Sequence, residues 1–303
     1  MSLFIQGMRR SGTTILFDAL LEDPGLRCFY EPLREQDLSV GGGSGARDID
    51  AFAETRALRE EFRRERYPDI PIDEFNWGGP RDPGLELDDR LPPHCRELLA
   101  YLVAQAPAVA IKETRLHHKV ADLAAIDPTA RLVHLVRDPR AVTASVMLGR
   151  GRKHADRFGT PDAFFGARTK RKLWSSRRIS ELLAERERGL EPDPPDYMRV
   201  LAVWKATFAA TRGAGMATLG ERYLMLRHEE LGAEPVTTMG RVYRFIGRPI
   251  PTEVSVWAGE HVADPKPIPF EGDPRWAEAA ERIGLAELAH DAGYTGLGAT
   301  LAQ

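Results

Sequence analysis

A loop bounded by two glycines carries the residues whose types and spacing suit chemistry best. It spans residues 7–14 with the sequence GMRRSGTT, which has the glycine spacing of the phosphate-binding pattern GxxxxGK[ST], with Thr13 at the lysine position. Consecutive backbone N–H groups at the start of a helix bind a phosphate even without that lysine. Arg10 still places a cationic side chain inside the loop. The loop therefore predicts a phosphate site.

The residues around the loop predict the elements that hold it. A short apolar run at residues 3–5 predicts a strand before the loop, and the apolar positions from Ile15 to Leu20 recur at helical spacing after it. A second short strand is expected over residues 26–30, and it ends at Glu31. Strand ends carry functional side chains in α/β folds, so Glu31 is a candidate site residue.

The rest of the chain continues the alternation of strands and helices. We expect strands at residues 109–111, 132–136 and 223–226, and helices at 51–67, from Pro139, and at 197–211, 236–246 and 276–290. This order is typical of an α/β fold with a three-layer, doubly wound parallel sheet. Composition changes nowhere sharply, so we expect one domain over residues 1–303, with lid or acceptor insertions at 39–95 and 150–195.

Composition excludes several classes of protein. The chain is 43% hydrophobic and 29% charged, as is usual for globular proteins, and it has no apolar run long enough to span a membrane. No signal peptide is recognisable, so we expect a cytoplasmic protein without a membrane span. The net charge of −3 offers no general attraction to nucleic acid. Cys28 and Cys95 lack the spacing of metal ligands, so no metal site is expected.

Three blocks of the chain resemble sulfotransferases that use 3′-phosphoadenosine 5′-phosphosulfate. The loop and its continuation LLEDPGLRCFYEP are similar to the 5′-phosphosulfate loop of that family, most of all in its tyrosylprotein and carbohydrate branches. The block RLVHLVRDPRAVTAS at residues 131–145 resembles the strand and helix that bind the 3′-phosphate. The block RYLMLRHEELGAEP, followed by RVYRFIG, resembles a later strand and helix. The resemblance implies the P-loop fold and a bacterial-type soluble enzyme.

The resemblance also implies roles for individual residues. Arg10 and Lys112 would stabilise the charge that develops on the leaving phosphate, and Arg137 with Ser145 would hold the 3′-phosphate. His228 takes the place of a cofactor-contacting Tyr of the tyrosine-sulfating enzymes, so it departs from their pattern. The residues with an implied role in cofactor binding are Arg9, Arg10, Ser11, Gly12, Thr13, Thr14, Arg137, Ser145, His228 and Lys266.

Glu31 is the candidate for the base that removes the proton of the acceptor hydroxyl. It follows Arg10 by twenty-one residues, the separation at which tyrosylprotein sulfotransferases place their catalytic Glu. Two alternatives stay open. Glu31 could be a structural carboxylate paired with Arg34, and His117 or His118 could be the base, since other branches of the family use His.

The expected reaction is the in-line transfer of a sulfuryl group to a hydroxyl of a small-molecule, glycoside or lipid acceptor, which leaves adenosine 3′,5′-bisphosphate and requires no metal. The main rival is a P-loop kinase in which Thr13 or Thr14 binds Mg²⁺ and Asp138 is the acidic residue. A second rival is a family member that binds the nucleotide without catalysis. The sequence fixes neither the acceptor nor the oligomeric state.

Overall fold

The computed structural model describes residues 1–33, 48–71, 75, 87–149, 158–168, 182, 190–191 and 193–298. Its centre is a parallel sheet of five strands in the order β2-β3-β1-β4-β5. The chain first winds to one side of β1 and then to the other, which is the doubly wound pattern. The predicted α/β class is therefore confirmed. The strands are β1 (Ser2–Gln6), β2 (Arg27–Tyr30), β3 (Val109–Glu113), β4 (Arg131–Val136) and β5 (Tyr223–Arg227).

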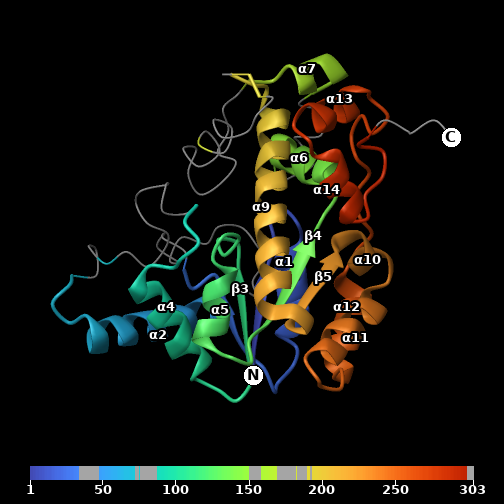
Figure 1. The fold of residues 1–303 in the computed structure, drawn as a ribbon. Helices are drawn as coiled ribbons and strands as arrows, with labels where there is room; N and C mark the ends of the chain where they lie inside the picture. Colours follow the sequence, from blue (N-terminus) through green and yellow to red (C-terminus); the bar gives the residue numbers. More distant parts are fainter. Residues whose placement is uncertain are drawn as a thin grey trace.

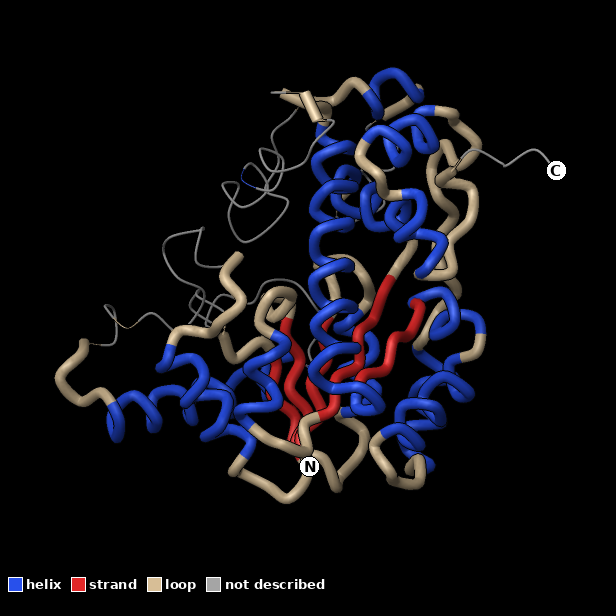
Figure 2. Tube along the Cα trace, in the orientation of Figure 1, coloured by secondary structure: helices blue, strands red, loops and turns tan. Residues whose placement is uncertain are grey.

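Helices cover both faces of the sheet (Figures 1 and 2). Successive side chains of a strand point to opposite faces, so Leu3 and Ile5 of β1 pack on one side and Phe4 packs on the other. On the face of Leu3 lie α1 (Thr13–Leu20), α11 (Pro235–Phe245) and α12 (Thr252–His261). The face of Phe4 is covered by α2 (Asp48–Arg66), α4 (Pro93–Val103), α5 (Val120–Ile126) and the long α9 (Asp196–Leu219).

A third apolar cluster lies beyond the carboxyl ends of the strands, in the upper part of Figure 1. In it Phe165 packs edge-on against Trp276, with ring centroids 5.0 Å apart. This cluster attaches the C-terminal helices to the part of the fold where the predicted site lies. Its helices are α6 (Pro139–Leu148), α7 (Pro161–Phe165), the N-terminal half of α9, α13 (Arg275–Arg282) and α14 (Ala286–Asp291).

The structure corrects two of the expected elements. The single helix expected at 276–290 is wrong, because Gly284 at φ +61° ends α13 before α14 begins. There the Leu285 N–H donates to the Ala280 carbonyl at 2.7 Å and the Gly284 N–H donates to the Glu281 carbonyl at 3.0 Å, which is the Schellman pattern. The helix expected at 197–211 extends to Leu219.

Parts of both proposed insertions fall outside the described residues, including 39–47 and most of 169–189. The first insertion was expected to end at residue 95, yet α4 already begins at Pro93, a residue type that suits a first helical turn. Within the described part of the chain, no helix combines the length and apolar character that a membrane crossing needs.

Candidate active site

The glycine loop joins the end of β1 to the start of α1, as predicted. Gly7 has no room for a side chain, because a Cβ there would lie 2.4 Å from the Leu135 carbonyl oxygen of β4. Gly12 precedes α1 at φ +89°, a conformation that side-chain-bearing residues rarely adopt. The Ser11 N–H donates to the Met8 carbonyl at 3.0 Å and closes the turn. The loop therefore presents backbone N–H groups at a helix start, where an anion binds well.

Two of the predicted catalytic residues have strained backbones. Among the described non-glycine residues, positive φ occurs at Arg10 (80°), Glu31 (44°) and Phe270 (55°). Such conformations cost free energy and are concentrated at functional sites, where the surrounding structure holds them in place. The strain at Arg10 and Glu31 therefore agrees with a functional role for both.

The second predicted phosphate-binding block meets the loop directly. Arg137 follows the last residue of β4, and its Nη1 donates to the carbonyl oxygen of Arg10 at 3.2 Å. The side chain of Arg10 points to α6, where its Nε donates to Ser145 Oγ at 2.8 Å. Burial lowers the pKa of Arg137, and the nearby Glu229 opposes that shift. Arg10, Arg137 and Ser145, which lie far apart in the sequence, thus form one contiguous site.

His228 lies against the loop from the other side. It is the first residue of α10 (His228–Ala233) and follows β5 as Arg137 follows β4. A Cβ on Gly12 would lie only 2.3 Å from its Nδ1, so glycine allows the ring to pack on the loop. Burial and the charge of Arg137 lower the pKa of His228 to about 4. The ring is therefore neutral near pH 7.

Three buried polar atoms around the loop have no hydrogen-bond partner. They are Ser11 Oγ, Arg137 Nε and His228 Nδ1, and they come from three distant parts of the chain. Buried polar groups are nearly always satisfied, so three unsatisfied atoms at one place are typical of a ligand-binding site. A hydroxyl and a guanidinium N–H are donors that suit phosphate oxygens, as are the loop amides. The residues present therefore fit a nucleotide phosphate.

Glu31 and Lys112 meet at the ends of neighbouring strands. Tyr30 of β2 pairs in register with Lys112 of β3, and the Lys112 ammonium forms an ion pair with Glu31 Oε1. Burial would lower the pKa of Lys112, but Glu31 and Tyr30 outweigh it and the pKa is raised. The Tyr30 ring lies 4.1 Å below the ammonium, and its hydroxyl is 3.1 Å from Thr14 Oγ1 of the loop. The partner found for Glu31 is thus Lys112, whereas Arg34 lies outside the described residues.

Glu113 is a buried carboxyl of this region that the sequence analysis missed. Its Oε1 accepts the N–H of Leu33 at 2.7 Å, just beyond Glu31 in the chain. Burial and the negative charge of Glu31 raise the pKa of Glu113 to about 7. Its position next to Lys112 at the end of a strand could have marked Glu113 as a candidate site residue. Its contact with Leu33 could not have been predicted from the neighbouring sequence.

The rival base His117 lies in the protein interior. Its ring nitrogens lie within hydrogen-bond distance of Gln6 Nε2, and Nδ1 is 3.0 Å from Thr211 Oγ1 of α9. Burial lowers the pKa of His117 well below its ordinary value, so the ring is neutral. These contacts engage both nitrogens with the core, which favours a structural role for His117. His118 is partly buried.

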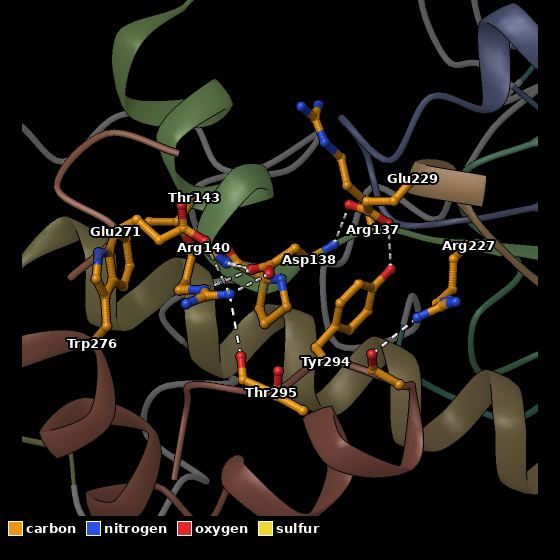
Figure 3. A network of polar contacts seen from close by, with 12 residues as sticks. Arg137, Asp138, Arg140, Thr143, Arg227, Glu229, Glu271, Trp276, Tyr294 and Thr295 are labelled. Atoms are coloured by element: carbon orange, nitrogen blue, oxygen red, sulfur yellow. Dashed lines mark hydrogen bonds and ion pairs between the residues drawn. The ribbon is translucent and has the colours of Figure 1, made fainter. Parts of the chain in front are cut away.

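Asp138, the acidic residue of the kinase alternative, is already occupied. Its Oδ1 accepts from Arg140 N at 2.8 Å and Nε at 3.1 Å, and its Oδ2 accepts from Arg140 Nη2 at 2.7 Å (Figure 3). Asp138 thereby caps α6, and both oxygens are engaged by one guanidinium. This arrangement does not offer a carboxylate to Mg²⁺. Nor do three or more metal-ligating side chains gather anywhere in the described ranges.

Two predicted cofactor residues stand apart from these contacts. Arg9 and Lys266 are both exposed, and neither forms a hydrogen bond or ion pair with the part of the chain that is described. Lys266 lies between α12 and α13, where the preceding Pro265 packs on Gly232 of α10. A role for either residue in cofactor binding stays a prediction.

Comparisons with known proteins find sulfotransferases among the proteins that this chain resembles. Carbohydrate sulfotransferase 3 of Tetronarce californica is 28% identical over 134 residues, which are 43% of this chain and 24% of that protein. The chain thus matches about a quarter of that relative's length. A sulfotransferase of Mycobacterium avium has a TM-score of 0.53 at 17% identity and covers 98% of this chain and 78% of its own. The sulfotransferase domain from the curacin biosynthetic pathway has a TM-score of 0.51 at 16% identity and covers 97% of both chains.

The structural likenesses show only that the fold is shared, because the sequence identities are low. The family assignment comes from the sequence, because the model of the Sulfotransferase family matches residues 2–252. That range contains the glycine loop, the ion pair at the strand ends and the Arg137 block. The chain therefore belongs to the Sulfotransferase family.

Proposed function

We propose that this protein transfers the sulfuryl group of 3′-phosphoadenosine 5′-phosphosulfate to a hydroxyl group of a small-molecule, glycoside or lipid acceptor. The observation that carries the proposal is the set of unsatisfied buried atoms on Ser11, Arg137 and His228 around a loop shaped to bind phosphate. The Sulfotransferase family supports sulfuryl transfer in general. The choice of donor rests on the second basic block beside the loop.

On the donor side, the chain offers two places for phosphate. The backbone N–H groups of Ser11 to Thr14, at the start of α1, suit the 5′-phosphosulfate. Arg137 and Ser145, which meet the loop through Arg10, suit the 3′-phosphate. A 3′-phosphate is absent from ATP, so this second place is what favours the sulfuryl donor. Arg10 and Lys112 supply the positive charge that the departing bisphosphate requires.

On the acceptor side, Glu31 is the proposed base. In the proposed step the acceptor oxygen forms a bond to sulfur as the bond from sulfur to the 5′-phosphate oxygen breaks, and that electron pair leaves with the bisphosphate. The hydroxyl proton passes to Glu31. The ion pair with Lys112 fixes the place of the carboxylate at the strand end. Residues 39–95 and 150–195 are proposed to select the acceptor.

Glu31→Gln tests this assignment, with Glu253→Gln at an exposed position of α12 as its matched control. Each protein is incubated with ³⁵S-labelled donor and a panel of phenols, sugars and hydroxylated lipids, and transferred label is counted. We expect Glu31→Gln to lower transfer by about 10²–10⁴-fold, the usual contribution of a placed base, with adenosine 3′,5′-bisphosphate binding retained. The control should transfer label normally, and EDTA should change neither result.

Other outcomes identify which part of the proposal fails. Equal loss of binding and transfer in Glu31→Gln would count against the role of Glu31 as base. Tight bisphosphate binding without transfer to any acceptor, by the unsubstituted protein, would favour the non-catalytic alternative. Transfer of phosphate from ATP would favour the kinase.

A further inference from the structure

The C-terminal segment returns to the candidate site. Residues 292–298 follow α14 and lie beyond the range that the family model matches, which ends at residue 252. The segment is fixed at two carbonyls, since Arg227 Nη1 donates to the Gly293 oxygen at 3.0 Å and Arg140 Nη2 donates to the Thr295 oxygen at 3.3 Å (Figure 3). Tyr294 lies between these two residues in the chain.

Tyr294 is a buried tyrosine whose hydroxyl has one charged acceptor. It donates to Glu229 Oε2 at 2.8 Å, and its ring packs edge-on against Trp204. Burial and the charge of Glu229 raise the pKa of Tyr294, so the hydroxyl stays protonated. Glu229 follows His228 at the start of α10, and its other oxygen, Oε1, accepts the N–H of Asp138 at 3.1 Å. Tyr294 and Asp138 therefore share one carboxylate.

These contacts hold a single peptide group at both of its polar atoms. Glu229 binds the N–H of the peptide between Arg137 and Asp138, and Trp204 Nε1 donates to its carbonyl oxygen at 2.9 Å. This peptide is the junction at which β4 ends and α6 is about to begin. The orientation of this peptide influences the direction in which the Arg137 side chain leaves the backbone.

The same contacts leave Nε of the Arg137 guanidinium available, while its Nη1 donates to the Arg10 carbonyl. Glu229 is close enough to influence the pKa of Arg137, yet both of its oxygens are used by other donors. Arg137 Nε has no partner. Without the Tyr294 hydroxyl, Glu229 Oε2 would lose its donor and become free to pair with Arg137. A carboxylate so paired would compete with a phosphate for the guanidinium.

We infer that Tyr294 is a positioning residue of the nucleotide site, which acts through Glu229 to orient the Arg137–Asp138 peptide and to keep Arg137 free for a 3′-phosphate. The inference rests on the proposed function, since it assigns that phosphate to Arg137. The C-terminal segment would then contribute to the donor site through Glu229, and not by direct contact of Tyr294 with the nucleotide.

The test is Tyr294→Phe, which removes one hydroxyl and keeps the buried ring. Calorimetric titration is done with adenosine 3′,5′-bisphosphate and, by competition against it, with adenosine 5′-monophosphate, which lacks the 3′-phosphate. We expect affinity for the bisphosphate to fall about tenfold, equivalent to about 1.4 kcal/mol, and affinity for the monophosphate to change less than twofold. Tyr243→Phe is the control, because the buried Tyr243 hydroxyl also donates to a carboxylate, Asp23 Oδ2 at 2.9 Å, in the α1 and α11 layer.

The results separate this inference from the proposed function. A selective loss for the bisphosphate in Tyr294→Phe but not in Tyr243→Phe supports the inference. Unchanged bisphosphate affinity in Tyr294→Phe overturns it, and so does an equal loss for both nucleotides, which would indicate general damage to the site. If the unsubstituted protein binds the bisphosphate no better than the monophosphate, the proposed 3′-phosphate site itself is wrong.

Discussion

Replacement of Gly12 by alanine would introduce both backbone strain and a steric clash into the phosphate loop. Its φ of +89° lies in the left-handed region, where a side-chain-bearing residue costs about 1–2 kcal/mol. The new Cβ would also lie 2.3 Å from His228 Nδ1 and 2.8 Å from Cε1. Ordinary carbon contacts are about 3.5–4.0 Å, so the ring or the loop must move by more than about 1 Å. We expect Gly12→Ala to abolish measurable binding of adenosine 3′,5′-bisphosphate.

Gly247→Ala separates strain from the clash. Gly247 has a φ of +73°, and no atom lies within 4 Å of the position that a Cβ would take. This control should lower the melting temperature by several degrees, through backbone strain alone, and leave calorimetric titration with the bisphosphate unchanged. Gly12→Ala should melt lower still, and adding His228→Ala should recover the difference by removing the ring. Normal bisphosphate binding by Gly12→Ala, with the melting temperature of the control, would refute the close packing of loop and ring.

Two further predictions concern buried titratable groups. Burial lowers the pKa of His134 to about 3, so its native ring stays neutral where an unfolded histidine gains a proton near pH 6.5. The contribution of His134 to stability is therefore fully present above pH 6.5 and is lost as the pH falls toward 3. Between pH 7.5 and pH 5 this residue should lower the free energy of unfolding, measured in urea, by about 2 kcal/mol. The loss should be smaller in His134→Gln. Lys112→Met leaves Glu31 without its cation and should lower the free energy of unfolding by about 3 kcal/mol. Adding Glu31→Gln to this variant should restore most of that loss. Both the single and the double variant should be inactive. Full stability of Lys112→Met would mean that the ion pair contributes little.

The glycine spacing predicted the phosphate loop, and the resemblance to sulfotransferases predicted the second basic block. Parallel strands end at the same edge of a sheet, and the structure pairs β1 with β4, so the loops that follow these two strands lie side by side. Arg10 and Arg137 accordingly meet, at a hydrogen bond of 3.2 Å. Their roles with a nucleotide stay predictions, as does the role of Glu31 as base.

Other features depend on contacts that local patterns do not encode. The pairing of Glu31 with Lys112 requires β2 to lie beside β3, and strand order is not visible in the sequence. The link between Tyr294 and Glu229 joins residues 65 positions apart, through a segment that carries no motif. In contrast, the break between α13 and α14 could have been predicted, because Gly284 is a common type of residue at the end of a helix.

The measurement that tests the central claim most directly is calorimetric titration of the purified protein with adenosine 3′,5′-bisphosphate, with Mg·ATP as the competing ligand and Arg137→Ala as the variant. The proposed donor site predicts binding of the bisphosphate, its loss in Arg137→Ala, and no binding of Mg·ATP. A preference for Mg·ATP, or bisphosphate binding that survives the loss of Arg137, would contradict it.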